Sequence, residues 1–206
     1  KIPGSELAKN VLSYQEVFEK GANIGEKVAI IGAGGIGFDV AEYLASRGGS
    51  PTLNLKKWLQ EWGVVDPELE RGGICLDNKR DLGLDGREIF LLQRRNERLG
   101  KGLGKTTGWI HRKSLLKKGV QMIGGVNYEE VLSEGLVVSF GDEKKDRKTL
   151  KVETIIVCAG QESETQLAKS LSKSKIDFQV IGGADICHEL DAKRAIDQGC
   201  RLAAQI

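Results

Sequence analysis

Three glycines, Gly32, Gly34 and Gly37, directly follow an apolar run that begins after Lys27. In this spacing the first glycine permits a sharp turn out of a strand, the second lets a bulky anion approach the backbone, and the third lets a helix pack closely on the strand. The helix start then offers unpaired N–H groups and a positive dipole end to a pyrophosphate. The indicated chemistry is dinucleotide binding; because the chain contains 27 glycines, an ordinary glycine turn is the alternative.

The sequence around the glycines favours the dinucleotide interpretation. Residues 28–31 are all apolar, which is typical of a strand buried on both faces. Ile36, Val40 and Leu44 then recur at helical spacing, and Gly48 predicts the end of that helix. Strand, tight turn and helix together form the unit that holds a dinucleotide in a Rossmann fold.

A second strand is predicted at 88–93, and it runs into Gln93, Arg94 and Arg95. In a nicotinamide nucleotide site a carboxylate at this strand end selects the free 2′-hydroxyl of the adenosine ribose, whereas arginine accommodates a 2′-phosphate. Because guanidinium groups form paired hydrogen bonds to phosphate, these residues favour NADP. A pair of solvated surface arginines is the alternative, and Glu97, a possible partner for a ribose hydroxyl, leaves NAD open.

The stretch 99–112, LGKGLGKTTGWIHR, is rich in glycine and basic residues. Its Gly-Lys-Thr triplet matches the end of a P-loop, but leucine stands where that motif needs its first glycine, so we reject a nucleotide triphosphatase. A flexible loop with Lys101 and Lys105, leading to a helix capped by Thr106 or Thr107, fits better. Its lysines could face cofactor phosphates or a partner domain; a surface loop without function is the alternative.

The later part of the chain predicts strands more than helices. After a strand at 120–123, the alternation between 126 and 153 predicts an antiparallel meander where a simple Rossmann repeat has a helix, with a charged turn at 142–148. The next buried strand ends on Ala159 and Gly160, small residues that leave room for a ligand at the carboxyl edge of the sheet.

Two further segments attract attention. Residues 178–185, FQVIGGAD, predict a strand, a double glycine and a helix start, with Asp185 placed to accept hydrogen bonds from hydroxyls. A cap or Asx turn is the alternative role for this acid.

Residues 48–86 form an insertion with a helix from Leu55 to Trp62, begun by an Asn N-cap and stopped by glycine. The two tryptophans of this helix either pack internally or form a docking surface.

Composition narrows the class of protein. With 31 basic and 29 acidic residues the chain is nearly neutral, which argues against a nucleic-acid partner. No apolar run approaches the length of a membrane span and no leader is recognisable, so a cytoplasmic protein is expected. The four cysteines have no CxxC spacing, so we expect no metal or iron–sulfur site from this chain alone. The first residue, Lys1, suggests a fragment.

Four stretches together resemble a known family: KVAIIGAGGIGFDVAEYL, LGKGLGKTTGWIHR, IIVCAGQE and VIGGADICHELDAKRAIDQG. In this order they resemble the C-terminal third of the bacterial 2,4-dienoyl-CoA reductases, flavoproteins related to old yellow enzyme in the trimethylamine dehydrogenase group. The similarity runs over nearly the whole chain and is weakest across the insertion and the charged turn at 142–148.

The resemblance implies an NADPH-dependent oxidoreductase that acts on unsaturated acyl-CoAs in fatty acid β-oxidation. FMN in a TIM barrel and a [4Fe–4S] cluster would lie in the missing part of the same polypeptide, the expected partner of this chain. Residues 25–162 would form an α/β, Rossmann-like NADP(H)-binding domain, inserted in an FAD-binding domain of which 1–24 and 163–206 are the remaining segments. An enoate reductase or trimethylamine dehydrogenase relative, or a non-catalytic docking module, is the alternative.

On this pattern the glycine motif holds the NADPH pyrophosphate, the arginines lie at the 2′-phosphate, and Asp185 belongs to a partly formed FAD site. No catalytic residue and no metal ligand is expected in this chain. The candidate cofactor-binding residues are Gly32, Ala33, Gly34, Gly35, Ile36, Gly37, Gln93, Arg94, Arg95, Lys105, Ala159, Gly160 and Asp185.

Overall fold

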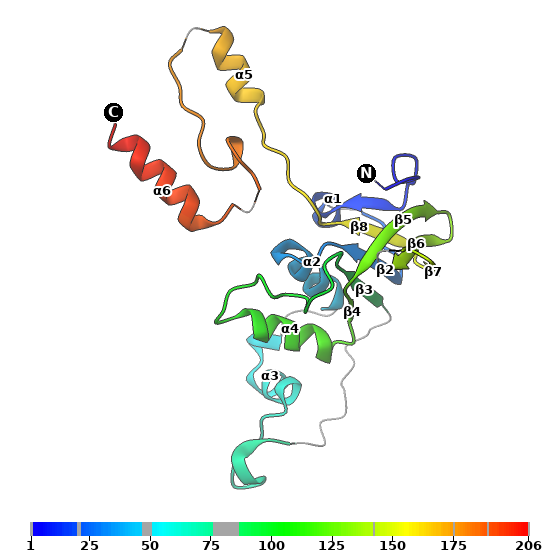
Figure 1. Cartoon of the computed structure of the whole chain (residues 1–206). Helices are drawn as coiled ribbons and strands as arrows, with labels where there is room; N and C mark the ends of the chain where they lie inside the picture. Colours follow the sequence, from blue (N-terminus) through cyan, green and yellow to red (C-terminus); the bar gives the residue numbers. More distant parts are fainter. Residues whose placement is uncertain are drawn as a thin grey trace. The chain divides into compact units, whose positions relative to one another are not determined.

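A computed structural model describes residues 2–19, 22–46, 51–75, 87–141, 143–174, 176–188 and 190–205. The chain divides into two compact units, Lys1–Ala159 (unit 1) and Gly160–Ile206 (unit 2), which are drawn in Figure 1. Gly48, most of the loop that ends the insertion and Asp142 of the charged turn lie outside the described residues.

Unit 1 is built on a five-stranded parallel sheet with the strand order β1-β8-β2-β3-β4. The strands of this sheet are β1 (Val11–Ser13), β2 (Lys27–Ile31), β3 (Glu88–Leu92), β4 (Gln121–Ile123) and β8 (Thr154–Val157). Because all strands run in one direction, the carboxyl ends of β2, β3 and β8 meet at one edge. The predicted α/β, Rossmann-like fold is confirmed.

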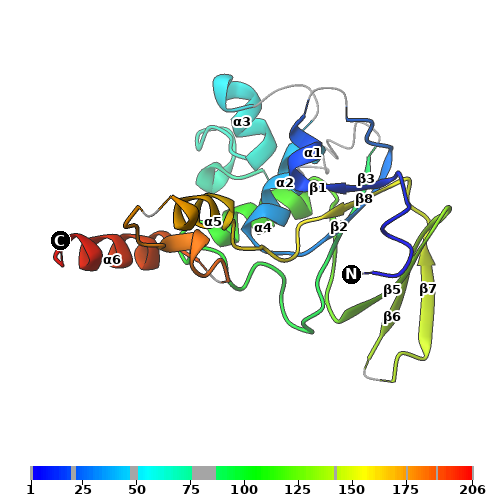
Figure 2. The same cartoon turned by 90° about the horizontal axis from the view of Figure 1, so that it is seen from above.

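The central strand β2 separates two layers of core. Val28 and Ile30 pack into a cluster with the helices, whereas Ala29 and Ile31 pack into a second cluster with the meander on the other side. Figure 2 shows the helices and the meander on opposite sides of the sheet. The helices of this layer are α1 (Tyr14–Phe18), α2 (Gly35–Ala45) and α4 (Gly108–Lys117). Burial on both faces is why β2 is apolar at four consecutive positions.

The predicted meander is present as a separate three-stranded antiparallel sheet, β5-β6-β7. Its strands are β5 (Val126–Leu132), β6 (Gly135–Phe140) and β7 (Asp146–Leu150). Strand β5 carries an irregularity in its register between Tyr128 and Glu130. A bulge of this kind bends the strand and re-aims the neighbouring side chains.

The N-terminal segment packs with unit 1. Strand β1 pairs with β8, and Ser13 and Glu16 form a capping box at the start of α1. The side chain of Val17 is buried in the core beneath α2. Residues 11–18 therefore belong to the same compact unit as the Rossmann sheet, and the units divide at Ala159, close to the end of the predicted 25–162 segment.

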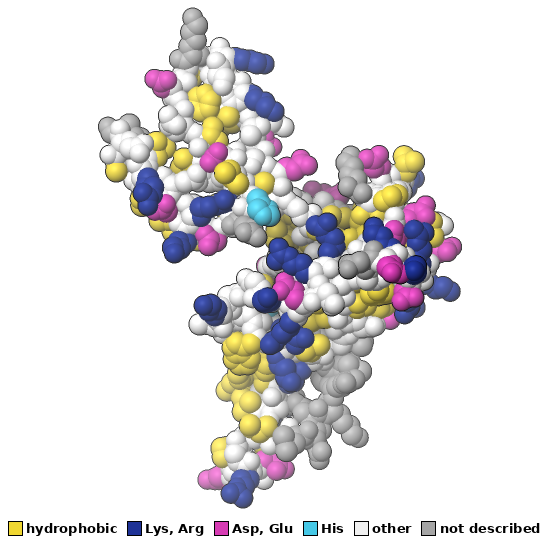
Figure 3. All heavy atoms as spheres, in the orientation of Figure 1, with side chains coloured by type: hydrophobic (Ala, Val, Ile, Leu, Met, Phe, Trp, Pro, Cys, Tyr) yellow, Lys and Arg dark blue, Asp and Glu magenta, His cyan; other side chains and the backbone are white. Residues whose placement is uncertain are grey.

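The insertion contains the predicted helix, α3 (Leu55–Trp62), between the short helices η1 (Pro51–Leu53) and η2 (Arg71–Gly73). Asn54 caps α3 by accepting a hydrogen bond from the Lys57 amide at 3.1 Å, and Gly63 ends it in a left-handed conformation. Lys117 of α4 lies 5.1 Å from the ring centroid of Trp62. No side chain of α3 is buried, and apolar side chains gather on the surface near α3 and α4 (Figure 3).

Unit 2 contains α5 (Gln166–Lys173), η3 (Gly182–Ala184) and α6 (Ala192–Ala203). The prediction of a strand at 178–181 is wrong, since these residues are irregular. A strand requires a hydrogen-bonding neighbour, and the described part of unit 2 contains no strand to pair with. No helix within the described ranges of either unit is long and apolar enough to cross a membrane.

Candidate nucleotide-binding site

The turn after β2 requires glycine at its first position. Gly32 has a φ of 106°, a conformation that side chains disfavour, and its amide donates to the Leu92 carbonyl at 2.9 Å. A Cβ at this position would stand 2.9 Å from the carbonyl carbon and oxygen of Cys158, the residue that directly follows the neighbouring strand β8. Gly32 therefore permits both the sharp turn and its close packing against the end of β8.

The other two glycines of the motif have opposite surroundings. A Cβ on Gly37 would overlap the carbonyl oxygen of Gly32, so α2 can lie this close to the turn only with glycine there. A Cβ on Gly34 or Gly35 would have no atom within 4 Å. Gly34 is the N-cap of α2 and provides no side-chain cap, so the first N–H groups of the helix face open space. This space and these donors fit a pyrophosphate.

The glycine turn opens into a cleft of about 280 Å³ at the carboxyl edge of the sheet. The cleft brings together four separate stretches of the sequence: the turn after β2, the end of β3 with its following loop, strand β5, and the residues just after β8. Its lining residues are Gly32, Ala33, Gly34, Gln93, Arg94, Arg95, Glu97, Lys101, Gly102, Tyr128 and Ala159. Seven of the candidate residues from the sequence thus share one cavity.

The remaining candidates lie elsewhere. Gly35, Ile36 and Gly37 form the first turn of α2, immediately behind the cleft. Lys105 lies on the turn before α4 and does not line this cleft. Thr107 is the N-cap of α4, as one of the two predicted choices, but its hydroxyl makes no capping hydrogen bond.

Gly160 and Asp185 belong to unit 2 and are described within that unit alone. The Asp185 carboxylate accepts a hydrogen bond from Gln198 Nε2 at 2.9 Å, and the Gln198 amide oxygen accepts one from the Gly182 N–H at 2.8 Å. Gln198 of α6 thereby links the double-glycine turn to the following acid. The Asp185 carboxylate therefore has a hydrogen-bonding partner within its own unit.

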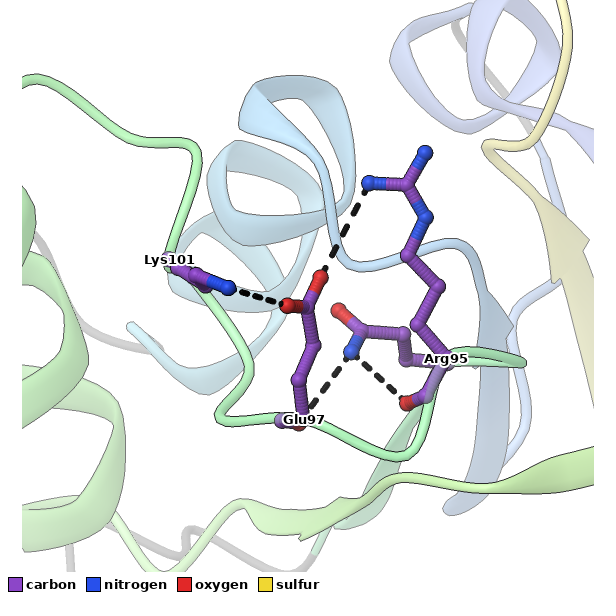
Figure 4. Close-up of polar contacts among 4 residues, drawn as sticks. Arg95, Glu97 and Lys101 are labelled. Atoms are coloured by element: carbon purple, nitrogen blue, oxygen red, sulfur yellow. Dashed lines mark hydrogen bonds and ion pairs between the residues drawn. The ribbon is translucent and has the colours of Figure 1, made fainter.

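Glu97 carries the negative charge of the cleft. Its carboxylate accepts a hydrogen bond from Lys101 Nζ at 2.8 Å and lies 3.7 Å from Arg95 Nη1 (Figure 4). The hydrogen bond from Lys101 is the main cause that lowers the pKa of Glu97, so this side chain is ionised at neutral pH. Gln93 Nε2 donates to the backbone carbonyls of Arg95 and Glu97 and so holds this turn in place.

Tyr128 is a lining residue that the sequence analysis did not identify. The backbone places it: the Val126 amide donates to the Gln93 carbonyl at 3.0 Å and the Gly125 amide to the Arg95 carbonyl at 3.2 Å, so β5 starts at the end of β3. Tyr128 and Arg94 line both the cleft and a second cavity of about 560 Å³ between the sheet, the meander and the N-terminal segment. The only sequence signal for this convergence is the short connection between β4 and β5.

Burial of the Tyr128 phenol raises its pKa to about 12. The phenol is neutral when protonated, so the unfolded chain loses its proton near pH 10 and the folded chain only near pH 12; stability is present below pH 10 and falls as pH rises through this window. At pH 11 the loss should amount to about 1.4 kcal/mol. Urea unfolding at pH 8 and pH 11 should show a smaller loss for Tyr128→Phe than for the unchanged chain. Equal losses of unfolding free energy in both proteins would mean that the titration of Tyr128 does not cause the loss.

The four cysteines are free and do not gather. Burial raises the pKa of the Cys158 thiol to about 12, so this cysteine at the end of β8 is an unreactive thiol at neutral pH. No cluster of three or more His, Cys, Asp or Glu side chains suited to a metal ion is found in the part of the chain that the structure describes.

The family model of the pyridine nucleotide-disulphide oxidoreductases matches residues 1–186, and the chain belongs to this family. The family binds FAD and a nicotinamide nucleotide. The parallel sheet, the glycine turn and the cleft at its carboxyl edge agree with this membership.

Individual relatives are larger oxidoreductases. A metal reductase of Desulforamulus reducens is 25% identical over 185 residues, which cover 89% of this chain and 25% of that protein. The structure of a 2-naphthoyl-CoA reductase matches with a TM-score of 0.67 at 21% identity, over 100% of this chain and 25% of that one. Histamine dehydrogenase from Rhizobium sp. 4-9 matches with a TM-score of 0.65 at 14% identity, over 96% and 26% of the two chains. These likenesses show the shared fold, and the chain spans about a quarter of each relative.

Proposed function

We propose that unit 1 binds NADPH and is the electron-input domain of a larger flavin-dependent oxidoreductase. The observation that carries this proposal is the single cleft that the glycine turn shares with Arg94 and Arg95. Family membership supports a nicotinamide nucleotide as the ligand. The small share of each relative that the chain covers supports a larger parent enzyme.

Each part of the cleft has its own task in this proposal. The open backbone at Gly34 and the first amides of α2 bind the pyrophosphate. Arg94, which has no ion pair with any described residue, is available to the 2′-phosphate. A bound NADPH supplies a hydride; the residues of this chain only hold and orient it. The flavin that accepts the hydride would be FAD, with FMN, a [4Fe–4S] cluster and a dienoyl-CoA site in the rest of a cytoplasmic parent polypeptide.

We assign unit 2 to the FAD side of that parent enzyme. The helices α5 and α6 bury no side chain, although Leu167 and Ile196 are large apolar residues that stand 71% and 64% exposed. Faces of this kind are expected to pack against further chain. In this proposal the missing remainder of an FAD-binding domain covers them, and Asp185 lies at its edge.

A second candidate function uses NADH, as an enoate reductase or trimethylamine dehydrogenase relative would. The observation in its favour is Glu97, a carboxylate that lines the cleft and can accept a hydrogen bond from a free 2′-hydroxyl. The two candidates differ only at the adenosine ribose. The relative affinity for NADPH and NADH therefore separates them.

Arg94→Ala tests the role of the strand end. Because this change removes charge-assisted hydrogen bonds to a phosphate, it should weaken NADPH binding by roughly 1.5 to 3 kcal/mol and leave NADH binding nearly unchanged. Arg71→Ala, in the exposed part of the insertion, is the control and should change neither affinity. Isothermal titration calorimetry of the unchanged chain and of both variants with each nucleotide gives the six affinities that are compared. Equal weakening of both nucleotides by Arg94→Ala would count against a 2′-phosphate contact.

A further inference from the structure

Glu97 stands between two cations inside the cleft that unit 1 offers to the nucleotide. Lys101 Nζ lies 2.8 Å and Arg95 Nη1 3.7 Å from its carboxylate oxygens. Both cations are largely exposed, whereas Glu97 is only 29% exposed. In Figure 4 the carboxylate lies between the labelled Lys101 and Arg95 side chains. The two cations that line the cleft beside Arg94 are thus already engaged by an anion of the chain itself.

We propose that Glu97 is a specificity-determining residue that competes with a 2′-phosphate for Arg95 and Lys101, an inference that rests on the proposed function. Glu97 thereby lowers the preference of the cleft for NADPH over NADH. Arg94 has no such competitor among the described residues. The preference for NADPH that remains therefore comes from Arg94.

The Glu97 carboxylate cannot easily move away from Arg95 and Lys101, because the backbone of this turn is fixed. Gln93 Nε2 donates to the carbonyl oxygens of Arg95 and Glu97, at 2.9 and 3.2 Å, and fixes the backbone that carries both side chains. When a 2′-phosphate enters, it brings a charge of about −1.5 to −2 close to the Glu97 carboxylate. Arg95 and Lys101 must then be shared between two anions. A free 2′-hydroxyl brings no charge and can donate to the carboxylate while both ion pairs persist.

The consequences of removing the carboxylate differ between the two nucleotides. Glu97→Gln keeps the size of the side chain and frees both cations, so NADPH should bind about three- to tenfold more tightly. NADH should bind equally well or about two- to threefold more weakly, since the hydroxyl loses a charged acceptor. The ratio of the NADPH and NADH affinities should therefore rise in Glu97→Gln.

A double-mutant cycle isolates the competition from a general charge effect. Lys101→Met should weaken NADPH binding more in the Glu97→Gln background than in the unchanged chain, because only there is Lys101 free to serve the phosphate. Glu88→Gln is the matched control. Glu88 lies at the other end of β3, pairs with Lys27 at 3.6 Å, and carries the same charge. It should leave the affinity ratio unchanged.

The experiment is calorimetric titration of the full 206-residue chain and these variants with NADPH and with NADH. A raised ratio in Glu97→Gln alone supports the competition. An unchanged or lowered ratio, or an equal rise in Glu88→Gln, overturns it while the proposed function stands. If the unchanged chain binds neither nucleotide, the proposed function fails first and this inference falls with it. Thermal unfolding of each variant confirms that the compared proteins are folded.

Discussion

Gly37→Ala is expected to destabilise unit 1 by about 3 kcal/mol or more, with loss of nucleotide binding as a consequence. The added Cβ would overlap the carbonyl oxygen of Gly32, which is backbone and cannot rotate away as a side chain would. Relief requires α2 to move off the sheet, which opens the core around Val40 and Leu44. Steric overlap with backbone in a closely packed core belongs to the changes with the largest effects.

Denaturant unfolding followed by tryptophan fluorescence measures this change. The three tryptophans, Trp58, Trp62 and Trp109, all lie in unit 1, so the signal reports on that unit. Gly199→Ala serves as the control, because a Cβ there has no atom within 4 Å and the site is a helix of unit 2. A Gly37→Ala protein with unchanged stability would mean that the turn and α2 are not packed as described.

Gly34→Ala should have the complementary effect, with normal folding and impaired binding. A Cβ at Gly34 meets no atom within 4 Å, and the backbone at this position has the extended conformation (φ −83°, ψ −172°) that alanine readily adopts. The methyl group would occupy the space into which a pyrophosphate must come. We expect the affinity for NADPH to fall about 100-fold, equivalent to about 2.7 kcal/mol.

The pair of variants separates the structural glycine from the ligand-facing one. Gly34→Ala should unfold at the same denaturant concentration as the unchanged chain but bind NADPH much more weakly in calorimetry. Gly37→Ala should lose both stability and nucleotide binding. Normal NADPH affinity in a folded Gly34→Ala protein would mean that the pyrophosphate does not bind at the glycine turn. NADH should be affected to the same degree as NADPH, since the two share the pyrophosphate.

Much of unit 1 was predictable because local signals and packing agree there. The apolar run of β2 and the glycine spacing after it identify the turn, and the structure gives Gly32 and Gly37 the steric roles expected of them. Asn54 and Gly63 bound the inserted helix for reasons that act within a few residues. Such features depend on neighbours in sequence, so the sequence alone carries them.

Other features depend on contacts across the chain. Phe178 to Ile181 have the composition of a strand but remain irregular, because pairing requires a partner strand and composition cannot supply one. Tyr128 enters the cleft through the link between β5 and the end of β3, a tertiary arrangement with no local signature. The partners of Glu97 lie only two and four residues away in the sequence, and their pairing follows from the turn that Gln93 holds.

Calorimetric titration of the 206-residue chain with NADPH and with NADH tests the assignment of unit 1 most directly. Because Arg94 has no ion pair within the described ranges and the glycine turn is open, NADPH should bind more tightly than NADH, and both affinities should depend on Gly34. Binding of neither nucleotide, or similar affinities for both, would contradict the assignment of unit 1 as an NADPH-binding domain.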